Sequence, residues 1–207
     1  MSRLPSVRAG KRVAIICEGF EETDYMNKLN SCGVWNPNII VDIKNAKSID
    51  SISSMYQYYY QNEYALVVVF CDTEKEPYDQ FLKLKRSIDD SIGNHASDFV
   101  VYFANPCTMQ IILSHFDFVS LKNNEKSKNA KLIGKLTGVS DYNAKESQRK
   151  AIMRKITSEN YVDMKSRISK LNKDYNNVPS SNCIILFEGL DGTNAEWVEK
   201  TARIIEE

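Results

Sequence analysis

The chain has 207 residues, 43% of them hydrophobic and 26% charged, and its 27 Lys and Arg balance its 27 Asp and Glu. This composition is typical of a soluble globular domain with a core of ordinary size. No apolar run approaches the roughly 20 residues of a membrane helix. The polar, basic residues 1–11 lack the apolar stretch of a signal peptide. We therefore expect a cytoplasmic protein with no membrane partner.

The charge is unevenly distributed along the chain. Residues 111–180 carry 14 Lys and Arg against 7 Asp and Glu, whereas residues 1–110 carry 11 against 14. A basic segment beside an acidic site suits a phosphodiester substrate. The same segment is equally explained as a set of solvated helix faces, since lysine is a common surface residue.

The cysteines give little support for a zinc site or a disulfide framework. There are five of them, none in a C-x-x-C pair, and the chain has only two histidines. Cys17 and Cys71 end apolar runs, where a free cysteine behaves as a small hydrophobe. We expect reduced thiols in a reducing compartment.

The predicted elements alternate between strand and helix through the first half of the chain. Short apolar, β-branched runs predict strands, and amphipathic segments opened by capping residues predict helices. The expected strands are 12–17, 38–43, 64–71 and 98–104, and the expected helices are 21–30, 48–62, 77–92 and 109–116. This alternation predicts an α/β fold with a mostly parallel sheet and helices on both faces.

The second half has a different character. Residues 122–176 are polar, Lys-rich and mostly helical in pattern, with breaks expected near Gly134 and Gly138. Residues 182–187 form one more apolar run, and Thr193 or Asn194 is expected to cap a last helix to Glu207. We expect an α/β core over 10–120, a basic helical part over 121–180, and a strand and helix over 181–207, together forming one compact unit.

Acidic clusters follow two of the predicted strands. Glu18 and Glu22 come directly after the first strand, and Asp72 and Glu74 come directly after the third. In an open α/β sheet the carboxyl ends of parallel strands line the binding crevice. Carboxylates gathered there repel one another unless a cation lies among them. The clusters therefore predict a metal site, although each alone is also explained as a helix-dipole partner or a polar loop.

At these residues the sequence resembles the Toprim domain, which occurs in topoisomerases, bacterial primases and nucleases of the overcoming-lysogenization-defect type. Among small Toprim proteins it resembles the RloB and AbiL-type abortive-infection proteins. Two segments carry the likeness, within residues 10–120: Cys17-Glu18-Gly19-Phe20-Glu21-Glu22-Thr23-Asp24-Tyr25, and Asn105-Pro106-Cys107 with the apolar segment that ends in His115-Phe116. The resemblance implies a Toprim-like, Rossmann-like fold.

The sequence departs from the family pattern at two positions. The second acid of the Asp-x-Asp pair is Glu74, a longer side chain that still offers carboxylate oxygens. Where the family usually has a glutamate two positions after the cysteine, this chain has Met109. The second departure leaves open a reduced site with weakened or lost activity.

The resemblance implies a metal-dependent nuclease that uses Mg²⁺ or Mn²⁺ to hydrolyse phosphodiester bonds in DNA or RNA. Glu18 and Asp72 would be catalytic, with Glu18 in acid–base work, and Glu18, Glu22, Asp72 and Glu74 would hold the metal. The residues expected to grip nucleic acid are Lys122, Lys126, Lys128, Lys131 and Lys135. An antiviral role, and an ATPase partner or a homo-oligomer, follow from the family alone.

Two other functions stay open. One is a catalytically weak or inactive Toprim-like subunit that binds or senses nucleic acid with a partner, which Met109 favours. The other is a flavodoxin-like nucleotide-binding domain. The latter is disfavoured because no G-x-G-x-x-G or Walker A sequence follows any predicted strand.

Overall fold

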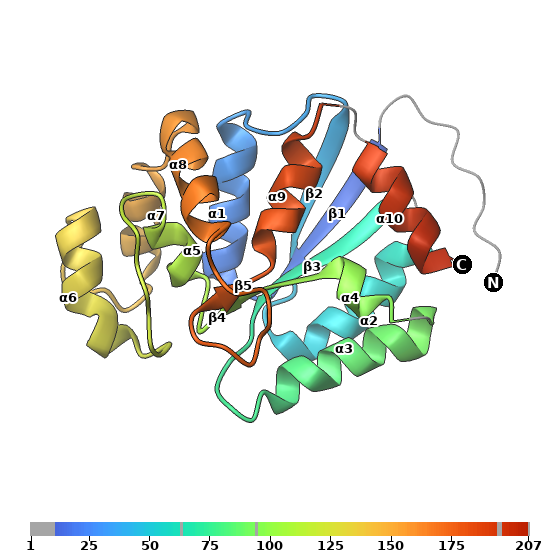
Figure 1. Cartoon of the computed structure of the whole chain (residues 1–207), viewed down its shortest axis with the longest axis horizontal. Helices are drawn as coiled ribbons and strands as arrows, with labels where there is room; N and C mark the ends of the chain where they lie inside the picture. Colours follow the sequence, from blue (N-terminus) through green and yellow to red (C-terminus); the bar gives the residue numbers. More distant parts are fainter. Residues whose placement is uncertain (1–10, 63, 94, 194–195, 207) are drawn as a thin grey trace.

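The computed structural model describes residues 11–62, 64–93, 95–193 and 196–206, and its centre is a five-stranded sheet (Figure 1). The strands are β1 (Lys11–Cys17), β2 (Ile39–Asn45), β3 (Leu66–Asp72), β4 (Val101–Asn105) and β5 (Ser180–Ser181). Their order is β2-β1-β3-β4-β5; the first four are parallel, and β5 is antiparallel to β4. The predicted mostly parallel α/β sheet is confirmed.

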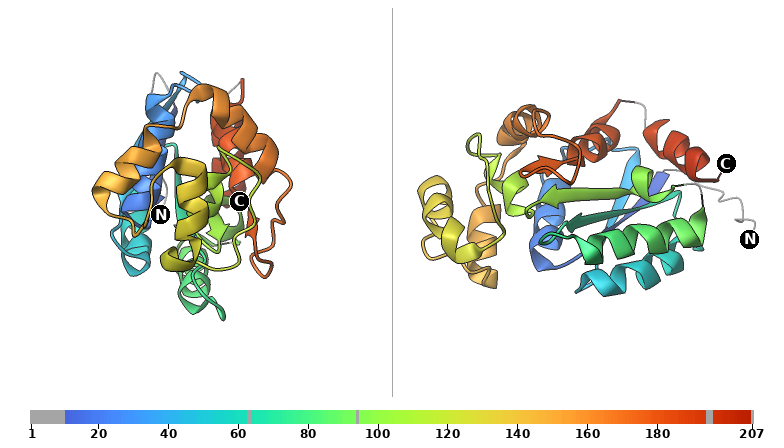
Figure 2. Two further views of the ribbon diagram at one scale, coloured as in Figure 1. Left: turned by 90° about the vertical axis from the view of Figure 1, so that its left-hand side faces the viewer. Right: turned by 60° about the horizontal axis from the view of Figure 1, so that its bottom comes forward.

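Helices cover both faces of this sheet. The helices are α1 (Phe20–Ser31), α2 (Ile49–Tyr60), α3 (Asp79–Ile92), α4 (Ser97–Val100), α5 (Met109–Leu113), α6 (Lys126–Thr137), α7 (Glu146–Met153), α8 (Ser158–Ile168), α9 (Cys183–Asp191) and α10 (Glu196–Glu206). Figure 2 shows α2 and α3 on one face, and α1, α9 and α10 on the other. The rings of Tyr25 in α1 and Phe187 in α9 lie 6.4 Å apart, which joins two helices distant in sequence.

The two central strands are apolar because both of their faces are buried. Every side chain of β1 from Val13 to Cys17, and of β3 from Leu66 to Cys71, is fully buried. Continuous β-branched runs of this kind are what a strand between two helical layers requires. These runs explain why the first and third strands were predicted well from the sequence.

The chain order creates a crevice at one edge of the sheet. From β1 the chain crosses through α1 to β2 on one side, and then returns through α2 to β3 on the other side. Neighbouring strands whose connections diverge to opposite faces leave a crevice outside their carboxyl ends. Helices α6 and α7 lie beyond that edge (Figure 2).

The described helices include none long and apolar enough to cross a membrane.

Three predicted elements are wrong in type or extent. The apolar run after Asn182 is helix α9, not a strand, because an apolar run that is buried all round carries no periodicity to separate the two. Residues 97–100 form the short helix α4 ahead of β4. Helix α6 continues through Gly134, where a break was expected. The break expected near Gly138 is confirmed, since α6 ends there and the Gly138 φ of 69° is the left-handed conformation that glycine adopts readily. The proposed cap Asn194 lies outside the described residues.

Candidate functional site

The strand ends bring Glu18 and Asp72 together, as predicted. Glu18 follows β1 directly, and its amide donates to the Phe70 carbonyl oxygen at 3.2 Å. Asp72 is the last residue of β3, and its amide donates to Glu18 Oε2 at 3.1 Å. The parallel pairing of β1 and β3 thus brings two acidic residues next to each other at the crevice.

Glu22 reaches the same place from the first turn of α1. Its Oε2 accepts a hydrogen bond from the Gly19 amide at 3.0 Å, as in a capping box. A Cβ added at Gly19 would lie 3.1 Å from Glu22 Oε2, so a small residue at position 19 lets the carboxylate fold back over the turn. Glu22 is only 6% exposed, so its charge has little access to water.

Asp72 is held from the opposite side by Thr108. Asp72 Oδ1 accepts two hydrogen bonds, from the Thr108 amide at 2.6 Å and from Thr108 Oγ1 at 2.7 Å. Thr108 directly precedes α5, so this contact ties the end of β3 to the turn that contains Cys107. Asn105 does not cap α5; its side-chain amide instead donates to the carbonyl oxygens of Tyr175 and Asn177 at 2.7 and 3.1 Å.

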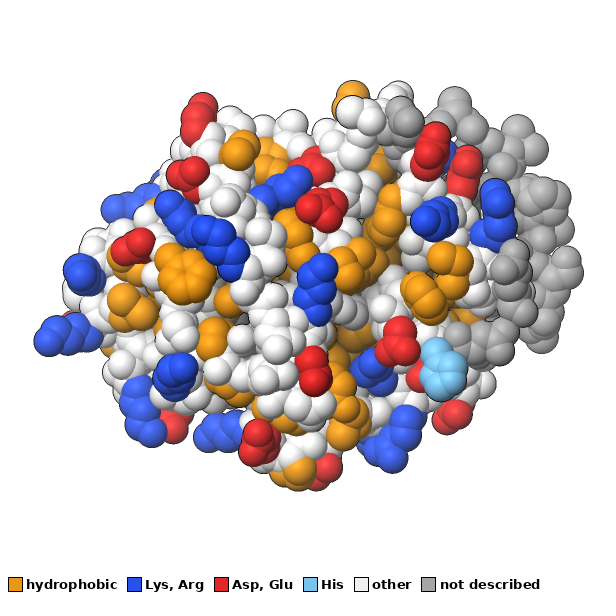
Figure 3. Space-filling view, in the orientation of Figure 1, with side chains coloured by type: hydrophobic (Ala, Val, Ile, Leu, Met, Phe, Trp, Pro, Cys, Tyr) orange, Lys and Arg blue, Asp and Glu red, His pale blue; other side chains and the backbone are white. Residues whose placement is uncertain are grey.

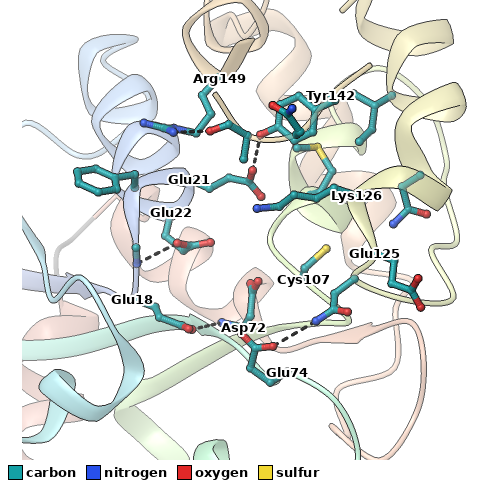
Figure 4. A pocket seen from close by; sticks show the side chains of 18 of the residues that line it. Glu18, Glu21, Glu22, Asp72, Glu74, Cys107, Glu125, Lys126, Tyr142 and Arg149 are labelled. Atoms are coloured by element: carbon teal, nitrogen blue, oxygen red, sulfur yellow. Dashed lines mark hydrogen bonds between the residues drawn. The ribbon is translucent and has the colours of Figure 1, made fainter. Parts of the chain in front are cut away.

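Glu74 lies at the margin of this group. Its backbone φ is 63°, and its Oε2 accepts a hydrogen bond from the Asn124 side chain at 3.2 Å (Figure 4). Its negative charge nevertheless contributes to raising the pKa of Glu18. Glu74 is therefore electrostatically part of the cluster, while its carboxylate is turned toward the segment that leads into α6.

The acids open into a cleft of about 870 Å³ between the sheet edge and helices α6 and α7. The cleft is lined by six carboxylate residues and by four cationic residues: Glu18, Glu21, Glu22, Asp72, Glu74 and Glu125, and Lys47, Lys75, Lys126 and Arg149. Figure 4 shows Glu18, Glu22 and Asp72 on one wall, with Lys126 reaching across toward Glu21. This volume is ordinary for a ligand site.

The pKa values of the three central acids are raised. Burial, followed by the charge of Glu22, raises the pKa of Glu18 to about 8, against the opposing hydrogen bond from the Asp72 amide. Burial and the charge of Glu21 raise the pKa of Glu22 to about 7. Burial and the charges of Glu22 and Glu18 raise the pKa of Asp72 well above its ordinary value. The hydrogen bonds within the cluster do not offset the cost of ionising all three acids.

Glu21 also lines the cleft, although it was not predicted as a site residue. It accepts a hydrogen bond from the Tyr142 hydroxyl, and the charges of Lys126 and Arg149 counter the rise in its pKa caused by burial. Arg149 Nε also donates to Asp24 Oδ2 at 2.7 Å. These contacts join α1 to the segment around α7, more than a hundred residues later in the chain.

The donor chemistry of the cluster fits a hard divalent cation, although the ligands are not converged on one. Carboxylate oxygens are the donors that Mg²⁺ and Mn²⁺ prefer, and the repulsion that raises the three pKa values would be relieved by a cation. Within the described ranges, however, no three His, Cys, Asp or Glu side chains form a group able to hold a metal ion as they stand. Both hydrogen bonds to Asp72 use Oδ1.

Of the five lysines predicted to grip nucleic acid, Lys126 lines the cleft. Lys128 donates to Glu125 at 2.7 Å on the exposed surface of α6. The others, Lys122, Lys131 and Lys135, are exposed and are not among the residues that line the cleft. Lys and Arg side chains gather over the end of the molecule formed by α6, α7 and α8 (Figure 3). The basic character of this end is thus mainly a surface property.

His115 has a structural place. Its Nε2 lies 3.0 Å from the Tyr25 hydroxyl, and its Nδ1 lies 2.8 Å from Asn160 Oδ1. Burial lowers the pKa of His115 to about 4, so the ring is neutral near pH 7. These hydrogen bonds join the turn after α5 to α1 and α8, and His115 is not among the cleft residues.

Met109, at the position where the Toprim proteins that the sequence resembles usually have a glutamate, lines the cleft. It is 3% exposed and lies in the first turn of α5, next to Thr108. An acid at this position would therefore face the same cleft as Glu22 and Asp72. The site of this chain has an apolar wall there instead.

A scan against protein-family models finds no matching family, and no curated protein or solved structure matches the chain significantly. The Toprim likeness therefore depends on the residues quoted from the sequence. The described strands form a Rossmann-like sheet, and its strand order places Glu18 and Asp72 at one crevice.

Proposed function

We propose that this chain is a metal-dependent nuclease that hydrolyses phosphodiester bonds of nucleic acid in the cleft outside β1 and β3. One observation carries the proposal. Three carboxylates, one directly after β1, one in α1 and one at the end of β3, have pKa values raised by burial and mutual repulsion and face one ligand-sized cleft. Such a group favours a bound divalent cation. The Toprim-like order of the acids along the chain points to the same chemistry.

In this proposal Glu18, Glu22 and Asp72 hold Mg²⁺ or Mn²⁺, and Glu74 supports them from the margin. The cation, when bound, supplies polarisation of the phosphate and a more acidic water. Glu18 has a pKa of about 8 before a cation binds, so it holds a proton near neutral pH. Glu18 either releases that proton and serves as a ligand, or keeps it for acid–base work while Glu22 and Asp72 hold the cation. Lys126, exposed on the rim of the cleft, attracts the phosphate backbone.

The second candidate is a nucleic-acid-binding or sensing subunit of the same architecture without turnover. Met109 favours it, because the apolar side chain occupies a wall position of the cleft where a further carboxylate would complete the family pattern. An ATPase partner, a homo-oligomeric assembly and a part in cytoplasmic antiviral defence belong to either candidate as proposals from the resemblance.

The test is hydrolysis of single- and double-stranded DNA and RNA with Mg²⁺ or Mn²⁺. Matched variants are Glu18→Gln and Asp72→Asn, which keep side-chain shape, and Glu188→Gln on the exposed surface of α9 is the control. We expect the first two to lose about a hundredfold or more in rate, the usual effect of removing a catalytic acid or base, while the control matches the wild type. Wild-type hydrolysis no faster than that of Glu18→Gln contradicts turnover at this site and leaves the binding subunit.

A further inference from the structure

Phe20 is an exposed aromatic ring at the mouth of a highly charged cleft. It is the first residue of α1, two positions after Glu18, and it lines the cleft. Its exposed fraction is 59%, whereas most of the large apolar side chains of the described chain lie in the core. Seven other large hydrophobic side chains of the described residues are also exposed, and single exposed side chains of this kind are common. Phe20 differs from those seven in that it lines the cleft.

The ring is backed by a fixed cation. The guanidinium carbon of Arg149 lies over Phe20, 5.4 Å from the ring centroid. Arg149 is itself held by its ion pair with Asp24 at 2.7 Å and by a hydrogen bond from Nη1 to the Ala144 carbonyl oxygen at 2.6 Å. The cation–π contact orients the ring before a ligand arrives, which lowers the entropic cost of stacking another flat group on it.

The cleft is large enough to enclose a small ligand. Its volume of about 870 Å³ lies within the range of sites that enclose small ligands. A base within a duplex is stacked between its neighbours, and reaching a pocket requires its removal from the stack. A single strand offers its bases without that cost, and aromatic side chains bind such bases by stacking.

We infer that Phe20, held by Arg149, is a base-stacking platform that makes this site selective for single-stranded nucleic acid. The inference rests on the proposed function in that it takes a phosphodiester backbone as the ligand of the cleft. Phe20 binds a base beside the acids and is a specificity-determining residue, not a catalytic one.

The experiment measures binding of labelled single strands, and of the duplex of the same sequence, by fluorescence anisotropy, with Ca²⁺ in place of Mg²⁺ and again in EDTA. One strand is an ordinary oligonucleotide and the other is abasic throughout, with the same number of phosphates. Variants are Phe20→Leu, which removes the ring, and Phe20→Trp, which restores one. Phe118→Leu is the matched control, since Phe118 is 57% exposed and is not a cleft residue. Thermal unfolding establishes that all variants fold.

We expect the wild type to bind the strand with bases at least about fivefold more tightly than the abasic strand, which corresponds to the stacking of one base. The difference disappears in Phe20→Leu and persists in Phe20→Trp and Phe118→Leu. A difference unchanged in Phe20→Leu, tighter binding of duplex, or no binding of either strand overturns the inference. Hydrolysis with Mg²⁺ is assayed separately: a base-dependent difference without hydrolysis removes the nuclease proposal alone, and hydrolysis without the difference removes the platform alone.

Discussion

The burial of Glu18 works against the folded state when no cation is bound. Burial, followed by the charges of Glu22 and Glu74, raises its pKa from 4.5 to about 8, against the opposing hydrogen bond from the Asp72 amide. A protein retains such an arrangement at the expense of stability when the arrangement serves a ligand. A substitution of Glu18 is therefore the most direct way to measure how the cluster affects stability.

We predict that stability in EDTA falls as the pH rises from about 5 to 8. The folded chain holds the proton of Glu18 up to about pH 8, whereas the unfolded chain releases it near 4.5. Since the folded state binds more protons in this window, the stabilisation present below pH 4.5 is lost as the pH passes through the folded pKa. Glu18→Gln removes the Glu18 contribution to this dependence and increases the free energy of unfolding at pH 8 by about 1–3 kcal/mol. The contributions of Glu22 and Asp72, whose pKa values are also raised, remain in the variant.

The measurement is urea unfolding across that pH range, with Glu188→Gln as the control on an exposed helix face. The buried His115 contributes in the opposite direction, because its folded pKa of about 4 favours folding as the pH rises from there toward 6.5. Comparison of Glu18→Gln with the wild type isolates the Glu18 contribution. Parallel pH profiles for these two proteins would rule out the predicted repulsion at Glu18.

A second prediction concerns the contribution of Asp72 to stability through its contact with Thr108. Its Oδ1 accepts from both the amide and the hydroxyl of Thr108, so Asp72→Ala leaves two buried donors without their partner. We expect Asp72→Ala to unfold about 1–3 kcal/mol more easily than the wild type. Asp72→Asn keeps an acceptor oxygen there and loses less. If calorimetry shows equal losses for the two variants, the contact with Thr108 is not what holds this turn.

At the scale of elements, two helical glycines have opposite roles. A Cβ at Gly189 in α9 would lie 2.3 Å from the Trp197 ring of α10, so Gly189→Ala forces the two helices apart and costs about 1–3 kcal/mol. A Cβ at Gly134 in α6 meets its nearest atom at 3.6 Å, so Gly134→Ala gains about 0.5–1 kcal/mol of helix propensity. Thermal midpoints of the two variants test this. A lower midpoint for Gly134→Ala than for Gly189→Ala would contradict the packing described.

The elements with a local signal were predicted from the sequence, and those that depend on tertiary contacts were not. The strands 12–17 and 64–71 are continuous apolar runs, and the positions of Glu18 and Asp72 follow from where these runs end. The run after Asn182 has the same composition but is helix α9, because burial on all sides removes the periodicity that separates the two.

The other site residues could not be predicted from local sequence patterns, because their contacts join residues far apart in the chain. Tyr142 and Arg149 reach α1 from residues more than a hundred positions away, and Thr108 reaches Asp72 from 36 positions away. Single polar residues in loops and helix ends carry no periodic signal. The basic segment was predicted as a nucleic-acid grip, yet Lys126 is the one of its five named lysines that lines the cleft.

At the scale of the whole molecule, the strand order determines where chemistry is concentrated. The divergence of the chain from β1 and β3 leaves the crevice that holds the acids, and α6 and α7 close its far side with Lys126 and Arg149. Acids from the sheet edge thus face cations from a part of the chain that carries net positive charge. Our central claim is that a divalent cation binds among these acids.

Calorimetric titration of Mn²⁺ at pH 8 tests that claim most directly, with wild type, Glu18→Gln, Asp72→Asn and Glu188→Gln in parallel. We expect saturable binding by the wild type and by Glu188→Gln. We expect the affinity for Mn²⁺ to be at least about tenfold weaker, or roughly 1.4 kcal/mol, in Glu18→Gln and Asp72→Asn. The same affinity in all four proteins, or no saturable binding by the wild type, would contradict the claim.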